Sequence, residues 1–270
     1  MSDRVSVTIT DGVADVRLNR PEKMNALDPA MFDGLIEAGE SVKANPSVRA
    51  VVLSGEGRAF CAGLDFGSFQ AMAEAPATPD RPTGDVDLGR KEGRITNRGQ
   101  QAAYVWREIP VPVIAAVHGV ALGGGFQIAL AADIRIVAPD VRMSVLEVRW
   151  GLIPDMTGTQ LLPQVVGLDV AKELTFTGRM VEGEEAVRIG LATRVSDTPL
   201  DDALTLAREI ADKSPQAVRG AKALLEMAGR VSLAEGFQAE ERTISALIGS
   251  TNQVEAVTAY FEKREPRFVD

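Results

Sequence analysis

Three consecutive glycines, Gly123 to Gly125, separate two apolar runs and limit how this part of the chain can fold. The run before them, 111–117, is predicted as a strand, and the run after them as a helix ending near Ala132. Glycine has no Cβ, so backbone N–H groups at such a turn can come very close to a ligand. The pattern predicts a strand, a tight turn and a helix whose positive end faces an anion.

A second loop of this kind follows a short apolar strand predicted at 50–53. It runs from Arg58 to Asp65 and includes Gly63. We expect Leu64 in this loop and Gly124 in the other to direct their N–H groups at one carbonyl oxygen, which stabilises negative charge as it develops there. Either loop alone is more simply a turn without function. Together they favour an oxyanion site.

The rest of the pattern predicts a layered α/β protein. Alternating valines on either side of Asp11-Gly12 predict a hairpin, and Asp28-Pro29 predicts the start of a helix that continues to about Ala44. The segment 66–99 is rich in Pro, Gly, Asp and Thr, which is typical of a long surface excursion. Repeated strand-then-helix segments favour a spiral of ββα units over 1–198, and the pattern of 199–270 is entirely helical.

Composition excludes several classes of function. The net charge is −9, from 29 basic and 38 acidic residues in a chain of 270, and no long basic run is present, so nucleic acid is not an expected partner. No apolar run is long enough to cross a membrane, and the first ten residues do not resemble a signal peptide. The single cysteine, Cys61, cannot form an internal disulfide and is expected to be buried. We therefore expect a cytoplasmic protein that binds neither membranes nor metals.

Two carboxylates stand in otherwise apolar stretches. Glu147 follows Val145-Leu146, and Asp155 follows Leu152-Ile153-Pro154. Burial raises the pKa of a carboxyl toward neutrality, where it can take up and release protons. Gln127, just after the glycines, can form hydrogen bonds but cannot exchange protons. The lone histidine, His118, has no Ser or Cys nucleophile to pair with in any motif and is expected to be a turn residue.

Taken together, these segments resemble the crotonase superfamily, the enoyl-CoA hydratase/isomerase family. The resemblance covers nearly the whole chain, and the segments that carry it are 18–27 (LNRPEKMNAL), 59–65, 119–133, 151–160 and 261–264. It implies a crotonase-like spiral with a helical C-terminal trimerisation region, a homotrimer or a dimer of trimers, and acyl-CoA substrates. It implies no metal and no redox cofactor.

The resemblance also assigns roles to individual residues. Leu64 and Gly124 match the two oxyanion-hole positions of the family. Arg58 and Lys263 match positions of basic residues near the CoA phosphates, and Ala62 matches a backbone contact to the adenine end.

The acid pair departs from the family pattern. Hydratases of the family use two glutamates, and here Glu147 matches the second while Gln127 occupies the position of the first. Asp155 matches a catalytic aspartate of dienoyl-CoA isomerases, although those enzymes also carry an acid where this chain has Gln127. Aryl-CoA dehalogenases have a nucleophilic aspartate at a similar position, but an aromatic residue where this chain has Glu147.

These residues predict that Glu147, with Asp155, moves a proton while Leu64 and Gly124 stabilise a thioester enolate. Double-bond isomerisation of an enoyl- or dienoyl-CoA fits best, because one carboxylate can take a proton from one carbon and return it to another. Hydration of a 2-enoyl-CoA is the alternative, and a non-catalytic acyl-CoA binding protein is a further one. Gln127, Phe66 and Trp106 are the expected contacts to the substrate.

Overall fold

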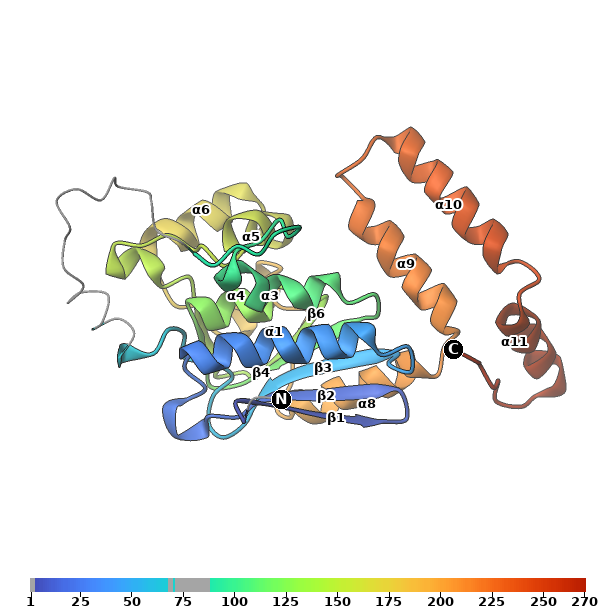
Figure 1. Ribbon diagram of the computed structural model, residues 1–270, viewed down its shortest axis with the longest axis horizontal. Coiled ribbons are helices and arrows are strands. Elements are labelled where there is room, and N and C mark those ends of the chain that lie inside the picture. The colour runs from blue at the N-terminus through green and yellow to red at the C-terminus, as the bar shows by residue number, and fades with distance from the viewer. Residues whose placement is uncertain (1–2, 68–69, 71–87) are drawn as a thin grey trace.

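The chain begins with the hairpin that its alternating valines predict. In the computed structural model, which describes residues 3–67, 70 and 88–270, β1 (Val5–Thr10) and β2 (Val13–Leu18) pair antiparallel. Most of the predicted surface excursion, 66–99, lies outside the described residues. The two strands form one edge of the main sheet (Figure 1).

The main sheet has six strands in the order β1-β2-β3-β4-β6-β8, and every pairing from β2 onward is parallel. A second sheet is the parallel pair β5-β7. The strands not yet located are β3 (Ala50–Gly55), β4 (Val113–Val117), β5 (Val120–Leu122), β6 (Ile134–Val137), β7 (Arg142–Ser144) and β8 (Arg194–Val195).

Successive strands alternate between the two sheets. The pairs β4–β5 and β6–β7 each give the first strand to the main sheet and the second to the small sheet, and α4 (Gly124–Leu130) follows β5. The chain after β3 passes in the same way from the main sheet to the small one, because Cys61 forms a parallel bridge with Ala121 of β5. The predicted spiral of ββα units is confirmed.

Helices cover both faces of the main sheet. On one face α1 (Pro29–Ala44) and α3 (Arg98–Glu108) pack over a large apolar core that includes Leu53. On the other face α8 (Pro199–Ala211) packs against Ala50 and Val52. Figure 1 shows α1 and α8 on opposite sides of the strands. The predicted start of α1 is confirmed, since Asp28 caps it by accepting a hydrogen bond from the Met31 N–H at 2.8 Å.

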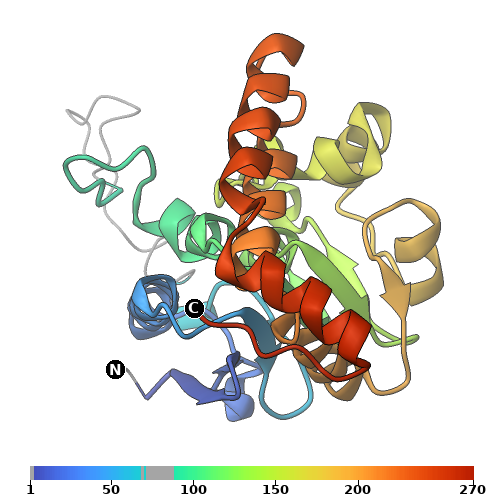
Figure 2. The same ribbon diagram turned by 90° about the vertical axis from the view of Figure 1, so that its right-hand side faces the viewer.

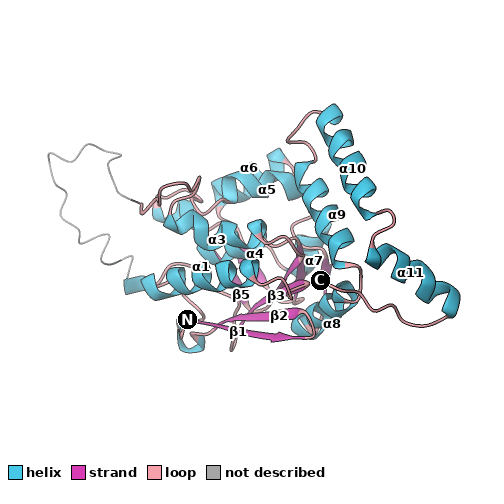
Figure 3. Ribbon diagram, turned by 45° about the vertical axis from the view of Figure 1, so that its right-hand side comes forward, coloured by secondary structure: helices cyan, strands magenta, loops and turns pink. Residues whose placement is uncertain are grey.

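The C-terminal region is mostly helical, as predicted: its helices lie between Pro199 and Glu262, and residues 263–270 are not helical (Figure 3). Its first helix, α8, belongs to the sheet layer, whereas the later helices extend away from it (Figure 2). None of the described helices is long and apolar enough to span a bilayer. The remaining helices are η1 (Pro21–Lys23), η2 (Glu147–Trp150), α5 (Gly158–Val166), α6 (Leu168–Thr177), α7 (Gly183–Arg188), α9 (Pro215–Met227), α10 (Leu233–Leu247) and α11 (Thr251–Glu262).

Candidate active site

The loop after β3 is held against β5 by backbone hydrogen bonds. The Cys61 N–H donates to Val120 O at 3.0 Å, and Cys61 O accepts from the Leu122 N–H at 3.0 Å. Both glycine-bearing loops therefore leave the sheet side by side. A Cβ on Gly63 would lie 2.6 Å from Leu122 O and 3.8 Å from the Gly124 nitrogen, so this contact requires glycine at position 63.

The N-terminal segment around Asn25 fixes the first loop from the other side. The Asn25 side chain is buried and donates to Ala59 O at 2.8 Å. The Leu27 N–H donates to Gly63 O at 2.8 Å, and the Asp65 N–H donates to Leu27 O at 3.1 Å. The sequence showed this segment only as part of a family resemblance. Its structural role is to hold the backbone on both sides of Leu64.

An ion pair adds a second restraint to this loop. Arg20 Nη1 lies 2.7 Å from Asp65 Oδ2 and also donates to Ala26 O at 3.1 Å. The hydrogen bond from the Gly67 N–H lowers the pKa of Asp65, and Arg20 acts in the same direction, so the carboxylate stays ionised. Sequence reasoning missed this pair, because the two residues lie 45 positions apart.

The second loop leads directly into α4, which begins at Gly124. Gly123 has a φ of +51° and anchors the turn by donating to Ser144 O at 3.0 Å. No hydrogen bond from the Leu64 or Gly124 N–H is found within the described part of the chain. Among the described residues, two main-chain donors on adjacent loops are thus without a partner, as the expected oxyanion site would require.

Glu147 lies beside this turn. A Cβ on Gly123 would be 3.3 Å from Glu147 Oε1, so the carboxylate is next to the residue that precedes Gly124. Oε1 accepts a hydrogen bond from Gln127 Nε2 at 2.6 Å, whereas Oε2 is buried and has no partner among the described residues. Burial raises the pKa of Glu147 above its ordinary value, and the charge of Asp155 acts in the same direction. These are the properties of a carboxyl that exchanges protons.

Asp155 precedes α5. It is exposed at the surface, although partial desolvation of its carboxyl raises its pKa. Thr157, two residues on, has a φ of +80°, which is strained for a β-branched residue, and its hydroxyl is buried without a partner in the described residues. Sequence reasoning did not single out Thr157.

A family model described as enoyl-CoA hydratase/isomerase matches residues 8–270. The chain belongs to this family. The predicted membership of the crotonase superfamily is confirmed, and the protein is an enzyme of this family.

Named relatives cover almost all of the chain. It is 36% identical to the peroxisomal Delta(3,5)-Delta(2,4)-dienoyl-CoA isomerase of Arabidopsis thaliana, over 93% of this chain and 90% of that one. It is 32% identical to the mitochondrial methylglutaconyl-CoA hydratase of Mus musculus, over 95% and 79%. The crystal structure of enoyl-CoA hydratase from Bacillus anthracis superposes with a TM-score of 0.85 at 31% identity and covers 98% of each chain.

The crotonase fold brings some of the predicted residues together. Arg58 and Ala62 lie on the loop that contains Leu64, and Arg58 is exposed. Lys263 follows the end of α11, one of the helices that extend away from the sheet layer (Figure 2). The grouping of Lys263 with Arg58 in one site stays a prediction.

The two predicted aromatic contacts differ in accessibility. Trp106 is completely buried in α3, where its indole N–H donates to Ala102 O at 3.1 Å. Phe66 is 77% exposed and packs edge-to-face on Trp150, with ring centroids 6.4 Å apart. Trp150 lies in η2, three residues after Glu147, and sequence reasoning did not select it.

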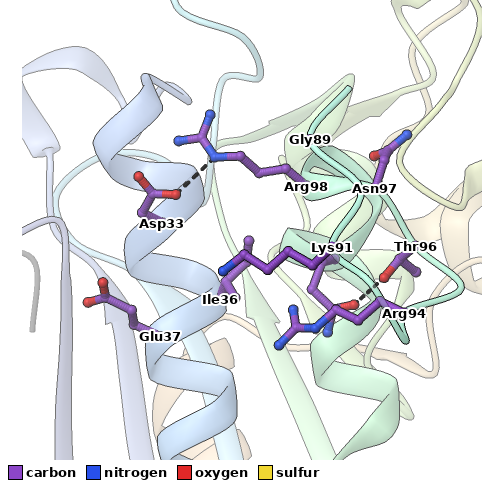
Figure 4. Close-up of a pocket in the computed structure, with 10 residues that line it drawn as sticks. Asp33, Ile36, Glu37, Gly89, Lys91, Arg94, Thr96, Asn97 and Arg98 are labelled. Atoms are coloured by element: carbon purple, nitrogen blue, oxygen red, sulfur yellow. Dashed lines mark hydrogen bonds and ion pairs between the residues drawn. The ribbon is translucent and has the colours of Figure 1, made fainter. Parts of the chain in front are cut away.

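A pocket of about 310 Å³ lies elsewhere, between α1 and the segment before α3 (Figure 4). Both of its arginines form ion pairs: Arg98 Nε lies 2.9 Å from Asp33 Oδ1 in the lining, and Arg94 Nη2 lies 2.9 Å from Glu40 Oε1 outside it. None of the predicted catalytic residues lines it. The glycine loops and Glu147, not this pocket, are the candidate active site.

Proposed function

We propose that this enzyme shifts a carbon–carbon double bond in an enoyl- or dienoyl-CoA. The observation that carries the proposal is the environment of Glu147, whose Oε1 is held by Gln127 while Oε2 is buried and unpartnered. The group that holds it is an amide, which cannot exchange protons. Glu147 is therefore a single proton carrier beside the two backbone donors.

In this mechanism Glu147 Oε2 removes a proton from C2 of a 3-enoyl thioester. The electron pair left at C2 delocalises onto the thioester oxygen, where the Leu64 and Gly124 N–H groups stabilise the dienolate. The protonated carboxyl then returns its proton to C4, and the double bond moves from C3–C4 to C2–C3. The carboxylate is regenerated, and no water is consumed.

The raised pKa of Glu147 supports this role, because a base that must also act as an acid works best near the working pH. The 36% identity to a dienoyl-CoA isomerase supports the same chemistry. Asp155 is proposed as an auxiliary carboxyl for substrates whose reprotonation site is more distant, such as a 3,5-dienoyl-CoA. Phe66 and Trp106 are kept as proposed contacts to the acyl part.

Hydration of a 2-enoyl-CoA is the second candidate function. The hydratases among the relatives favour it, and Glu147 Oε2 is a buried polar atom without a partner among the described residues, to which a water could hydrogen-bond. Unlike isomerisation, hydration needs a group that orients the water. Gln127 is an amide and cannot act as a second carboxylate in this role.

For the CoA part and the assembly we retain the expectations from the sequence. Arg58, Ala62 and Lys263 are proposed to contact CoA, with no metal or redox cofactor. A homotrimer or a dimer of trimers is proposed for the tail, because α10 and α11 expose large apolar side chains, among them Leu233, Phe237 and Phe261. A cytoplasmic location stays a prediction, and light scattering of the purified protein tests the assembly.

The function is tested with crotonyl-CoA, a 3-enoyl-CoA and a 3,5-dienoyl-CoA. We expect faster isomerisation than hydration, and we expect Glu147→Gln to lose about 10²- to 10⁴-fold in kcat/KM. Glu209→Gln, at an exposed carboxylate on α8, is the matched control and should keep wild-type rates. Faster hydration would favour the second candidate, and binding without turnover would favour an acyl-CoA binding protein.

A further inference from the structure

Gln127 is completely buried, and both ends of its amide contact the protein. Oε1 accepts hydrogen bonds from the Met156 N–H at 2.8 Å and the Gly158 N–H at 2.9 Å, and Nε2 donates to Glu147 Oε1 at 2.6 Å. Packing also confines the side chain, since a Cβ on Gly158 would lie 2.8 Å from Gln127 Oε1. Because both ends of the amide are bonded to the protein, neither end is turned to a substrate.

The orientation of the amide follows from its partners. Backbone N–H groups can only donate, so the atom facing Met156 and Gly158 must be the acceptor oxygen. The amino group must then face Glu147, whose Oε1 accepts its hydrogen bond. This arrangement directs the hydrogen bond at one chosen carboxylate oxygen and leaves Oε2 free.

The same side chain caps α5 from another helix. The first N–H groups of a helix have no partner inside it, and Thr157 at the N-cap position provides no side-chain cap. Gln127 Oε1 satisfies the Gly158 N–H instead. The strained turn 155–158 is thereby tied to α4 and, through the other end of the amide, to Glu147.

We propose that Gln127 is a positioning residue that does not bind substrate. Its amide holds Oε1 of Glu147 in place, so that Oε2 alone carries the transferred proton. It also anchors the turn that contains Asp155 and Thr157. This inference rests on the proposed function of Glu147. It replaces our expectation that Gln127 contacts the substrate.

An amide serves this purpose where a carboxylate does not. A glutamate at position 127 could still accept both N–H groups with one oxygen, but its other oxygen would face Glu147 Oε1 at about hydrogen-bond distance. Two carboxylates that close must share a proton and titrate as a coupled pair. With glutamine, Glu147 titrates as one group, which suits transfer of a single proton between two carbons.

The test compares Gln127→Met, Gln127→Glu and a control, Gln101→Met. Gln101 is also a buried glutamine with both amide ends engaged, but its partners are Thr96 and Glu108 and not Glu147. The readouts are kcat and KM across pH, the ¹³C shift of the Glu147 carboxyl during titration without substrate, and hydrogen exchange at the Met156 and Gly158 amides.

For Gln127→Met we expect kcat to fall about 10²-fold with KM near wild type, because the carboxyl loses its fixed position. The acid limb of the pH profile of this variant's kcat should move to higher pH, since the hydrogen bond from Gln127 that lowers the pKa of Glu147 is lost. Both amides should exchange faster. Gln127→Glu should protect the amides again while Glu147 titrates in two coupled steps, and Gln101→Met should shift neither the acid limb nor the carboxyl titration.

A raised KM with unchanged kcat in Gln127→Met would show direct substrate binding and overturn the proposal. If kcat falls but the titration of Glu147 does not move, Gln127 has only a structural role, and the proposal is overturned as well. The titration and the exchange measurements need no turnover. If Glu147→Gln proves fully active, the proposed function fails, while these two readouts still decide whether Gln127 holds Glu147 and caps α5.

Discussion

Lys222 of α9 extends into the core and places its Nζ 2.7 Å from Asp133 Oδ2 and 2.9 Å from Val111 O. Its buried position lowers the pKa of the lysine, and the aspartate opposes this shift. The pair joins the C-terminal helices to the chain that connects α4 and β6, so the tail is anchored by a charge with little access to water.

We predict that Lys222→Met destabilises the protein by about 3 kcal/mol, because it leaves the partly buried Asp133 without its counter-charge. Urea unfolding followed by circular dichroism measures the change. Lys172→Met removes an exposed lysine on α6 and should stay within about 0.5 kcal/mol of wild type. Equal stability of the two variants would mean that the ion pair does not hold α9.

A second prediction concerns Cys61, which is 0% exposed and donates its thiol hydrogen to Asn25 O at 3.1 Å. Burial raises the pKa of the thiol to about 12, so the reactive thiolate is scarce at neutral pH. We expect alkylating reagents to label Cys61 only as the protein unfolds, with rapid labelling in denaturant as the control. Fast labelling of the native protein would contradict this.

The local signals in the sequence predicted most of the fold. The hairpin, the capped start of α1, the strand before the glycines and the helical tail each depend on residues close together in the chain. The sequence also predicted that the two glycine-bearing loops lie side by side, although the second loop follows β5 of the small sheet and not directly the strand expected at 111–117.

The partners of the site residues could not be predicted in the same way. Gln127 and Glu147 lie 20 positions apart, and nothing in the local pattern indicates that the amide of Gln127 caps α5 and holds Glu147. The Arg20–Asp65 ion pair depends likewise on tertiary placement. Local sequence chooses elements and turns, whereas the packing of distant segments decides which polar atoms remain free for chemistry.

The glycine at position 124 provides a third prediction. A Cβ there would lie 2.6 Å from Leu27 Cδ1 and 2.9 Å from Met156 Sδ, so Gly124→Ala must displace the turn or these two flexible side chains. We expect about a 10²-fold loss in kcat/KM, comparable with losing one oxyanion donor. Full activity would indicate that the thioester oxygen binds elsewhere.

Gly236→Ala is the control for this substitution. Gly236 lies within α10, and a Cβ there would meet no atom within 4 Å in the described structure. Alanine is the better helix former, so this variant should gain about 0.5–1 kcal/mol of stability with unchanged rates.

Thr157 gives a fourth prediction, on stability alone. Its φ of +80° is costly for a β-branched residue, and its buried hydroxyl has no partner among the described groups. Thr157→Gly relieves the strain and should raise the free energy of unfolding by about 1 kcal/mol. Gly151→Ala makes the reverse change at a φ of +71° where a Cβ meets nothing, and should lower it by about 1 kcal/mol. A destabilised Thr157→Gly would mean that the hydroxyl is satisfied.

The last prediction links the stability of the protein to the ionisation of Glu147. Burial raises the pKa of this carboxyl above its ordinary value of 4.5, so the folded state binds the proton more tightly than the unfolded state does. The stabilisation from this proton is fully present below 4.5 and is lost as the pH rises through the raised pKa. Above that pKa the folded protein holds a partly buried negative charge.

Glu147→Gln removes this charge and resembles the permanently protonated residue. We therefore expect the variant to be more stable than wild type at about pH 8 and close to wild type at about pH 4, as measured by urea unfolding at both values. Asp155 titrates in both proteins, so its contribution largely cancels in the comparison. A stability difference that does not change with pH would contradict a raised pKa at Glu147. The folded enzyme would then hold the Glu147 carboxylate without a cost in stability.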